Sequence, residues 1–155
     1  MKQPAVDRQC GDVIGESLDQ AADLTLRYLS DRAGLSVSAG YLLNRLSREG
    51  PRRLTWLAGK EGVSQPSMTQ LIQRLARQDL VTRLTDPDDG RVALIALTPT
   101  GEALLDERRK TRRERLTELL ETLSPEEQAA LWLSARVALP ILHRLVENAD
   151  SLDKT

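Results

Sequence analysis

The feature that most constrains the fold is the stretch Leu57–Pro66, which has the composition of a helix end, a tight turn and a helix start. Ala58 is small enough to let two helices cross closely, and Gly62 suits a turn that needs a positive φ. Ser64 can cap the next helix, and Pro66 falls in its first turn, where a missing N–H does no harm. This pattern predicts a helix-turn-helix.

The helix predicted after this turn, at about residues 66–78, has two chemically different faces. One face is apolar at helical spacing and consists of Met68, Leu71, Ile72 and Leu75. The opposite face consists of Ser67, Gln70, Gln73, Arg74 and Arg77, with no acid before Asp79. Amides, hydroxyls and guanidinium groups suit base edges and phosphates, so the pattern favours DNA recognition. A solvated helix face is the alternative, but it leaves the turn and the following hairpin unexplained.

A β-hairpin is predicted directly after this helix. Residues 80–84 and 91–98 have strand patterns, and residues 86–90 have turn composition throughout. A hairpin after a recognition helix makes a winged helix-turn-helix. Arg91 on the wing can enter a minor groove, where the potential is most negative, and Asp89 can orient it. A surface salt bridge without a DNA partner is the alternative.

Five further helices are predicted around this motif, at about residues 12–30, 37–49, 54–61, 99–121 and 125–146. Residues 1–11 are expected to be a leader and 147–155 a tail. Ser36 is the expected cap of the second helix, with Tyr41 facing inward, and Ser124 and Glu127 form a capping box for the last. The middle of the 99–121 helix is polar all round, which suits a solvated strut or, alternatively, a basic nucleic-acid face.

Composition limits the classes of function. The 155 residues carry a formal net charge of −1, so a DNA surface must come from local clustering of basic residues. No apolar run approaches the roughly 20 residues of a membrane span, and the N-terminus has no signal-peptide core, so a cytoplasmic protein without a membrane partner is expected. No metal set, phosphate-cradling loop or catalytic arrangement is present, which excludes an enzyme and predicts no cofactor.

Two residue types occur once each. Cys10 and His143 cannot build an ordinary zinc site or an intrachain disulfide. Cys10 is either a redox sensor or an incidental thiol before the first helix. His143 lies among apolar residues and is expected to be packed or at the surface rather than catalytic.

The whole pattern resembles the MarR family of bacterial transcriptional regulators. The resemblance is carried by Leu57-Ala58…Gly62-Val63-Ser64-Gln65-Pro66-Ser67-Met68-Thr69, then Leu71…Leu75, Leu80-Val81-Thr82-Arg83, Asp86-Pro87-Asp88-Asp89-Gly90-Arg91 and Leu97-Thr98-Pro99-Thr100-Gly101. The Asp-x-Arg wing followed by Leu-Thr-x-x-Gly is the more specific part, because many families share the helix-turn-helix.

This resemblance implies a mainly α-helical fold with a small β-hairpin wing and a single domain over residues 1–155. Residues 36–98 would be the winged helix-turn-helix, and residues 12–30 and 116–147 would be dimerisation helices. It implies a homodimer, most often a repressor, that binds a pseudo-palindrome in double-stranded DNA and is released by a small aromatic or phenolic effector. A peroxide-sensing branch of the family has its reactive cysteine inside the first helix, whereas Cys10 is expected to precede it. A helical scaffold protein without specific DNA binding remains the alternative.

Candidate site residues follow from the motif and the resemblance together. Arg52 and Arg53 are adjacent arginines before a short helix and are either phosphate ligands or an ordinary solvated pair. The predicted DNA-binding residues are Arg52, Arg53, Ser64, Gln65, Ser67, Met68, Thr69, Gln70, Gln73, Arg74, Arg77, Arg83, Asp89 and Arg91. The aromatic candidates for an effector are Tyr28, Tyr41 and Trp56, of which Trp56 is alternatively core.

Overall fold

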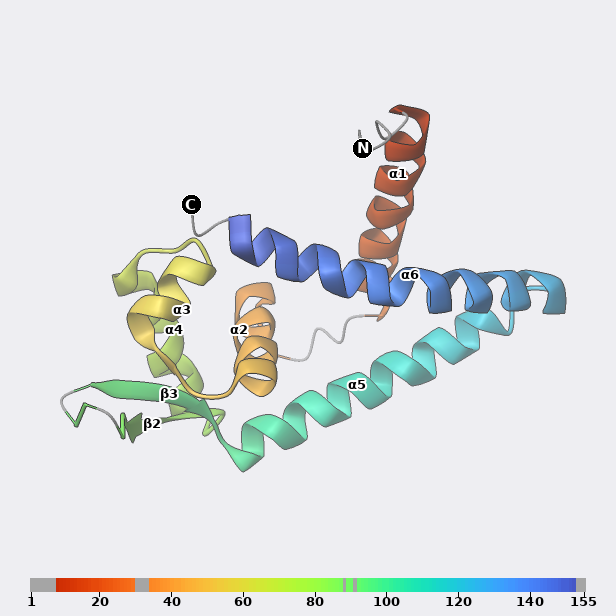
Figure 1. Cartoon of the computed structure of the whole chain (residues 1–155). Helices are drawn as coiled ribbons and strands as arrows, with labels where there is room; N and C mark the ends of the chain where they lie inside the picture. The colour runs from red at the N-terminus through yellow and green to blue at the C-terminus, as the bar shows by residue number, and fades with distance from the viewer. Residues whose placement is uncertain (1–7, 30–33, 88, 91, 153–155) are drawn as a thin grey trace. The chain divides into compact units, whose positions relative to one another are not determined.

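The computed structural model describes residues 8–29, 34–87, 89–90 and 92–152, of which Arg8 and residues 150–152 are described by their backbone alone. In chain order the elements are α1 (Arg8–Leu24), the π-helix η1 (Thr25–Leu29), α2 (Val37–Glu49), β1 (Arg52–Arg53), α3 (Leu54–Lys60), α4 (Gln65–Arg77), β2 (Val81–Thr85), β3 (Ala93–Leu97), α5 (Pro99–Leu120) and α6 (Pro125–Leu152) (Figure 1). The chain forms two compact units, residues 1–113 and 114–155. Mainly helical architecture with a winged helix-turn-helix is therefore confirmed.

The predicted helix signals hold in the first unit. Ser36 caps α2 by accepting a hydrogen bond from the Ala39 N–H at 3.2 Å, and Gly50 follows its end with a φ of 74°. Gly62 has a φ of 63° in the turn between α3 and α4. A β-carbon is unfavourable at these positive φ values, so glycine is the residue that allows the chain to turn there.

The wing is a three-stranded antiparallel sheet in the order β1-β3-β2. Val81 pairs with Leu97 at one end of the β2–β3 ladder and Thr85 with Ala93 at the other. The third strand, β1, was not predicted, because two residues carry no periodicity; pairing of Arg52 with Ile95 defines it.

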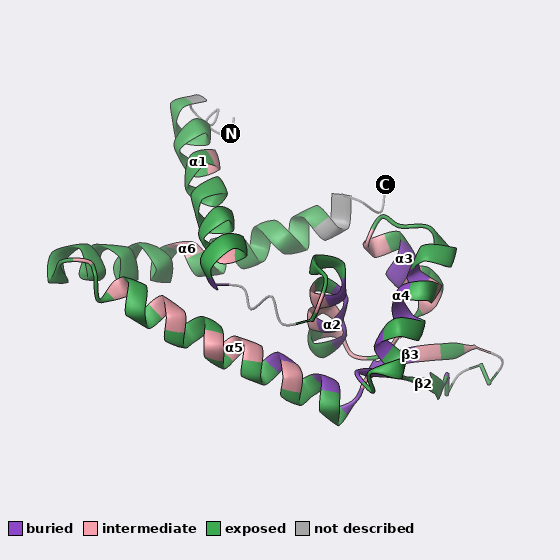
Figure 2. Ribbon diagram, turned by 180° about the vertical axis from the view of Figure 1, so that it is seen from behind, coloured by how far each residue is buried: buried purple, intermediate pink, exposed green. Residues whose placement is uncertain are grey.

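The hydrophobic core lies in α2, α3, α4 and the strands, with Leu105 of α5 added. Leu42, Leu57, Met68 and Ile72 are almost completely buried, and Figure 2 shows these elements carrying the buried positions. The prediction that Tyr41 faces inward is wrong, since 60% of its surface is exposed. The apolar stripe of α2 instead runs through Ala39, Leu42, Leu43 and Leu46.

A close junction joins the end of α4 to the start of α5. The Thr98 hydroxyl accepts a hydrogen bond from the Gly101 N–H at 3.0 Å and donates one to the carbonyl of Asp79. The Thr100 hydroxyl donates to the Asp79 carboxylate at 2.8 Å. A β-carbon on Gly101 would lie 2.3 Å from the Leu80 carbonyl oxygen, so the Leu-Thr-x-x-Gly motif is required by packing.

The second unit contains α6 and the end of α5. Its predicted capping box is confirmed, because the Ser124 N–H donates to Glu127 at 2.8 Å and the Glu127 N–H donates to the Ser124 hydroxyl at 3.3 Å. Helix α6 continues through Pro140 and extends to Leu152, beyond the predicted end near 146. The predicted tail is therefore wrong for residues 147–152.

Helix α6 also corrects the expectation about membrane spans. Within the described residues, Pro125–Ala149 is long and apolar enough to cross a bilayer, judged by length and composition alone. None of its most apolar 18-residue window is buried. The sequence prediction that no stretch could span a membrane was too strict.

The first helix begins earlier than predicted. Helix α1 starts at Arg8, so Cys10 lies within its first turn rather than before it, and the side chain is exposed. One of the two reasons for separating this chain from the peroxide-sensing branch, a cysteine before the first helix, is therefore wrong. The other, the lack of apolar and tyrosine neighbours around Cys10 in the sequence, stays a prediction.

Candidate DNA-binding surface

The start of α4 is held in place by its cap and by the preceding turn. The Ser64 hydroxyl accepts a hydrogen bond from the Ser67 N–H at 3.3 Å and lies 2.9 Å from the Ser67 hydroxyl. The Val63 N–H donates to the Ala58 carbonyl at 3.1 Å, which closes the turn after α3. The Met68 N–H donates to the Ser64 carbonyl at 3.0 Å, so the first turn of α4 is well defined.

The outer face of α4 presents the predicted polar side chains. Exposed positions on this face are Gln65, Ser67, Gln70, Gln73, Arg74 and Arg77, while Thr69 is half-buried and donates to the Gln65 carbonyl at 2.9 Å. Within the described residues, no hydrogen bond or ion pair engages the side chains of Gln70, Gln73, Arg74 or Arg77. These donors and acceptors are available to an external partner.

Met68 is the exception among the predicted α4 contacts. Its side chain is fully buried and belongs to the core cluster. The prediction that Met68 contacts DNA is corrected for this reason: the residue supports the helix from its inner face.

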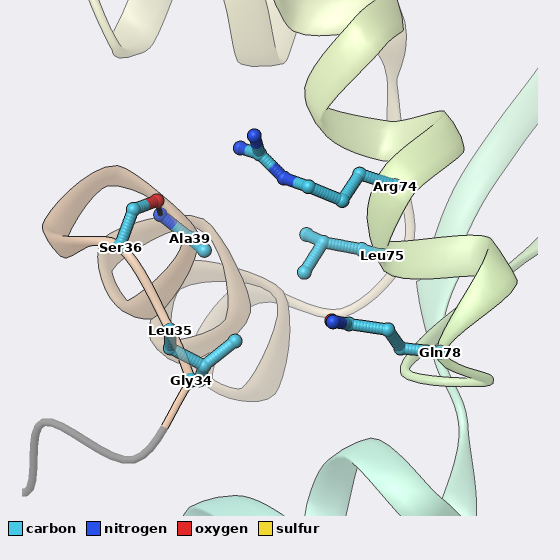
Figure 3. A pocket seen from close by; sticks show the side chains of 7 residues that line it. All are labelled: Gly34, Leu35, Ser36, Ala39, Arg74, Leu75 and Gln78. Carbon is cyan, nitrogen blue, oxygen red and sulfur yellow. Dashed lines mark hydrogen bonds between the residues drawn. The ribbon is translucent and has the colours of Figure 1, made fainter.

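Arg74 lies beside a small pocket of about 160 Å³ between α2 and α4, lined by Gly34, Leu35, Ser36, Ala39, Arg74, Leu75 and Gln78. Figure 3 shows Arg74 and Gln78 extending from α4 and its C-cap toward the N-terminal end of α2. The N–H groups of Ala39 and Gly40 at the start of α2 already donate to Ser36. The pocket therefore leaves room for the Arg74 side chain without defining a ligand.

The wing contributes Arg83 and Asp89. Arg83 is exposed on β2, where it pairs with Ile95, and Asp89 is exposed in the following turn. Arg91 lies outside the described residues, so its predicted position in the minor groove stays a prediction.

The two adjacent arginines of β1 have different neighbours. Arg53 donates from Nη2 and Nε to Oδ2 of Asp86, at 2.7 and 3.1 Å. The Arg52 guanidinium lies 5.2 Å from the centre of the Trp56 ring, and its Nε is 3.7 Å from Glu49. The idea of an ordinary solvated pair is thus wrong for Arg53, whose side chain is half-exposed but held by a buried carboxylate.

Trp56 sits in an ionic network that joins α2, β1 and the end of α3. Arg45 donates to Glu61 at 2.7 Å and to Glu49 at 3.1 Å, and its guanidinium lies 5.9 Å from the Trp56 ring. Burial alone would lower the pKa of Arg45, but hydrogen bonds and charge attraction to both glutamates outweigh it and raise that pKa. The permanently charged Arg45 therefore fixes Glu61 next to the turn that leads to α4.

Known proteins match this chain in its sequence as well as in its fold. The model of the MarR family matches residues 35–93, which run from α2 through β2 and the wing turn to the first residue of β3. An uncharacterised HTH-type transcriptional regulator of Mycobacterium bovis is 34% identical over 117 residues, covering 76% of this chain and 82% of the relative. This chain belongs to the MarR family.

Solved structures of transcriptional regulators have the same fold. One from Thermotoga maritima aligns with a TM-score of 0.71 at 20% identity and covers 91% of this chain and 99% of its own. S. aureus MepR bound to ethidium bromide aligns with a TM-score of 0.55 at 23% identity, covering 87% and 95%. As a MarR family member, this protein is a DNA-binding HTH transcriptional regulator and not an enzyme.

The three aromatic residues predicted for an effector differ in their surroundings. Tyr28 and Tyr41 are exposed, at 58% and 60%, while Trp56 is partly buried against the core. Within the described residues, no hydrogen bond or ring contact joins any two of them. Trp56 therefore packs against the core, which was the alternative interpretation of this residue. That Tyr28 and Tyr41 bind an effector stays a prediction.

The described residues offer no metal site. Over the described part of the chain, no group of three or more His, Cys, Asp or Glu side chains could hold a metal ion. Sequence reasoning missed Asp86, Arg45 and Glu61 as residues that shape the surface. The sequence contains only a weak sign of a special role for Asp86. Asp86 lies in a segment with two further aspartates, a proline and a glycine, and a turn alone accounts for an aspartate there.

Proposed function

We propose that this MarR family protein is a dimeric repressor that binds a pseudo-palindromic operator in double-stranded DNA. The observation that supports this most directly is the outer face of α4, which is exposed and free of acids. Its side chains at 70, 73, 74 and 77 have no interaction partners among the described residues. A helix of this kind fits the major groove, where amides and guanidinium groups distinguish base pairs.

Separate groups of residues would read bases and hold the backbone. The proposed base contacts are Gln65, Ser67, Thr69, Gln70, Gln73 and Arg74. The proposed phosphate contacts are Arg52, Arg74, Arg77 and Arg83, with the Gln65 N–H at the start of α4. Arg91, oriented by Asp89, would enter the flanking minor groove.

The dimer is proposed from the apolar surface of α1 and α6. In α6 the exposed large hydrophobic residues are Leu131, Trp132, Leu133, Val137, Leu139, Ile141, Leu142, Leu145 and Val146, and in α1 they are Val13, Ile14, Leu18 and Leu24. Surfaces of this extent are normally covered by protein. A bilayer is the poorer occupant for α6, because Arg136 and Arg144 would each cost about 2.5–3.5 kcal/mol near its centre.

Release by a small aromatic or phenolic molecule is proposed by analogy with S. aureus MepR, which was solved with ethidium bromide. Exposed Tyr28 and Tyr41 could stack on such a ring. Because the partner is chromosomal DNA, we place the protein in the cytoplasm and propose no membrane partner.

A gel-shift titration on DNA from upstream of the coding region tests this proposal. Wild-type protein should retard that fragment in the presence of excess competitor DNA. A Gln70→Ala variant should bind it about 5- to 150-fold more weakly, as expected for one lost bidentate base contact. The matched control is Gln20→Ala, an exposed glutamine on α1, which should bind like wild type.

The same experiment distinguishes the scaffold alternative. A scaffold protein would show no preference for any sequence over competitor DNA, and Gln70→Ala would then equal Gln20→Ala. That outcome would contradict the proposed function.

A further inference from the structure

The wing contains a carboxylate that is almost completely buried. Asp86 follows β2 directly, and its side chain is 7% exposed. The other described residues between positions 82 and 94 are exposed or half-buried. Its N–H donates to the Val92 carbonyl at 2.9 Å, so its backbone closes the turn across the hairpin. A buried carboxylate needs a charged or hydrogen-bonding partner to be stable.

Arg53 is such a partner, 33 residues earlier in the chain. Two of its N–H groups converge on the same oxygen, Asp86 Oδ2, at 2.7 and 3.1 Å. The backbone of Arg53 is fixed by the pairing of β1 with β3, where it lies opposite Leu94. The ion pair therefore ties the turn of the wing to the strand that leads into α3.

We infer that Arg53 is a positioning residue for DNA binding, which acts through Asp86 by holding the wing turn in the orientation that meets DNA. The inference rests on the proposed function, in which the wing contacts the operator. It assigns the main effect of Arg53 to this tie rather than to a phosphate contact.

Two further observations favour this role. The wing sequence contains Asp86, Asp88 and Asp89, so the positive charge of Arg53 offsets part of the negative charge that would repel DNA phosphates. Arg53 is also the N-cap residue of α3 but makes no side-chain capping bond, so replacing it removes no helix cap. Loss of its side chain should affect the wing more than α3.

For the order of the wing in the free protein, Arg52 provides a matched control on the same strand. Its side chain stacks over Trp56 and approaches Glu49 rather than the wing turn. Neighbouring residues in a strand point to opposite faces, so the Arg52 side chain can be removed without disturbing the ion pair between Arg53 and Asp86.

The experiment uses a duplex of about 24 base pairs, selected by wild-type protein from a randomised pool, which is long enough for two half-sites one helical turn apart. Affinities are measured for Arg53→Ala, Asp86→Asn, the double variant and, as a control outside the proposed DNA contacts, the exposed Gln20→Ala. Arg52→Ala is compared with Arg53→Ala in the free protein only. Hydroxyl-radical footprints are recorded for each complex. Hydrogen exchange of the wing amides is measured in the free proteins.

If Arg53 acts through Asp86, Arg53→Ala should weaken binding about tenfold in the wild-type background but less than about twofold in the Asp86→Asn background. Protection should be lost in the outer minor grooves, where the wing lies, and retained in the major groove. Wing amides near Thr85 and Ala93 should exchange faster in free Arg53→Ala than in free Arg52→Ala.

An equal cost of Arg53→Ala in both backgrounds, with wing protection and wing exchange unchanged, would overturn the inference and make Arg53 an independent phosphate ligand. Since the footprint and the exchange of Arg53→Ala decide this without Asp86→Asn, instability of the latter does not prevent the test. Failure to select any duplex would instead contradict the proposed function itself.

Discussion

The two units of this protein differ in how far a single chain can bury its own apolar residues. The first contains a closed core around Leu42, Leu57, Met68 and Ile72. In the described part of the second unit, residues 114–149, no side chain is buried, although α6 is apolar enough in composition to cross a membrane. The core formed by α2, α3, α4 and the strands is therefore complete within one chain, whereas the large apolar residues of α6, like those of α1, are left exposed. We propose that a second chain covers them, so that α4 would be used on DNA only in a dimer.

The largest expected effect comes from the core of the first unit. Leu75→Ala should lower the free energy of unfolding by about 2–5 kcal/mol, because Leu75 is 1% exposed and the variant leaves a cavity beneath α4. Urea titration followed by circular dichroism measures this. Leu133→Ala in α6, at 59% exposure, is the matched control, and only its effect should depend on protein concentration. A loss below about 0.5 kcal/mol for Leu75→Ala would contradict a closed core.

The second largest expected effect concerns α6, in the second unit. Val137→Asp places a charge on the exposed apolar face of α6 and should raise the dimer dissociation constant about a hundredfold. Sedimentation equilibrium over a range of concentrations measures the change. Glu121→Gln, an exposed polar change in the same unit, should leave the constant unaltered. An unchanged mass distribution for Val137→Asp would remove α6 from the proposed interface.

A smaller effect separates base reading from charge. Arg74→Ala should cost about 1–3 kcal/mol of operator affinity and relax one operator position if Arg74 contacts a base. Arg74→Lys keeps the charge but loses the planar fork, so it should also relax that position while retaining the salt dependence. Competitive binding to single-base operator variants measures both. Wild-type selectivity in Arg74→Lys would show that Arg74 contacts a phosphate instead of a base.

The smallest effect concerns the start of α6. Ser124→Ala removes the hydroxyl that accepts from the Glu127 N–H and should cost about 1 kcal/mol of stability. Thermal unfolding at fixed concentration measures this. Ser134→Ala is the control, since its hydroxyl bonds only within the helix to the Ala130 carbonyl. A loss of stability equal to that of Leu75→Ala would contradict an ordinary capping role for Ser124.

Local signals were sufficient to predict most helix boundaries. Ser36 and Gly50 bracket α2 as predicted, and Ser64 caps α4, because caps and positive-φ glycines act within a few residues of the chain. The amphipathic pattern of α4 likewise predicted its inner and outer faces. The exception is Met68, which was predicted to contact DNA and is buried.

Features that depend on distant residues could not be predicted in this way. Strand β1 exists because Arg52 and Arg53 pair with β3, over 40 positions later, and two residues have no period of their own. The tie between Arg53 and Asp86 has the same origin. The prediction for Tyr41 was wrong for a related reason. The apolar residues of α2 are compatible with two orientations of the helix, and contacts with α4 and β3 determine which face is buried.

The central claim is that the outer face of α4 is used twice, once by each of two identical chains on one duplex. Hydroxyl-radical footprinting of the DNA upstream of the coding region tests it most directly. Two protected half-sites of related, inverted sequence should appear with centres about 10 base pairs apart, or one helical turn. A single protected patch, or protection that survives the loss of Gln70 and Arg74 side chains together, would contradict the account.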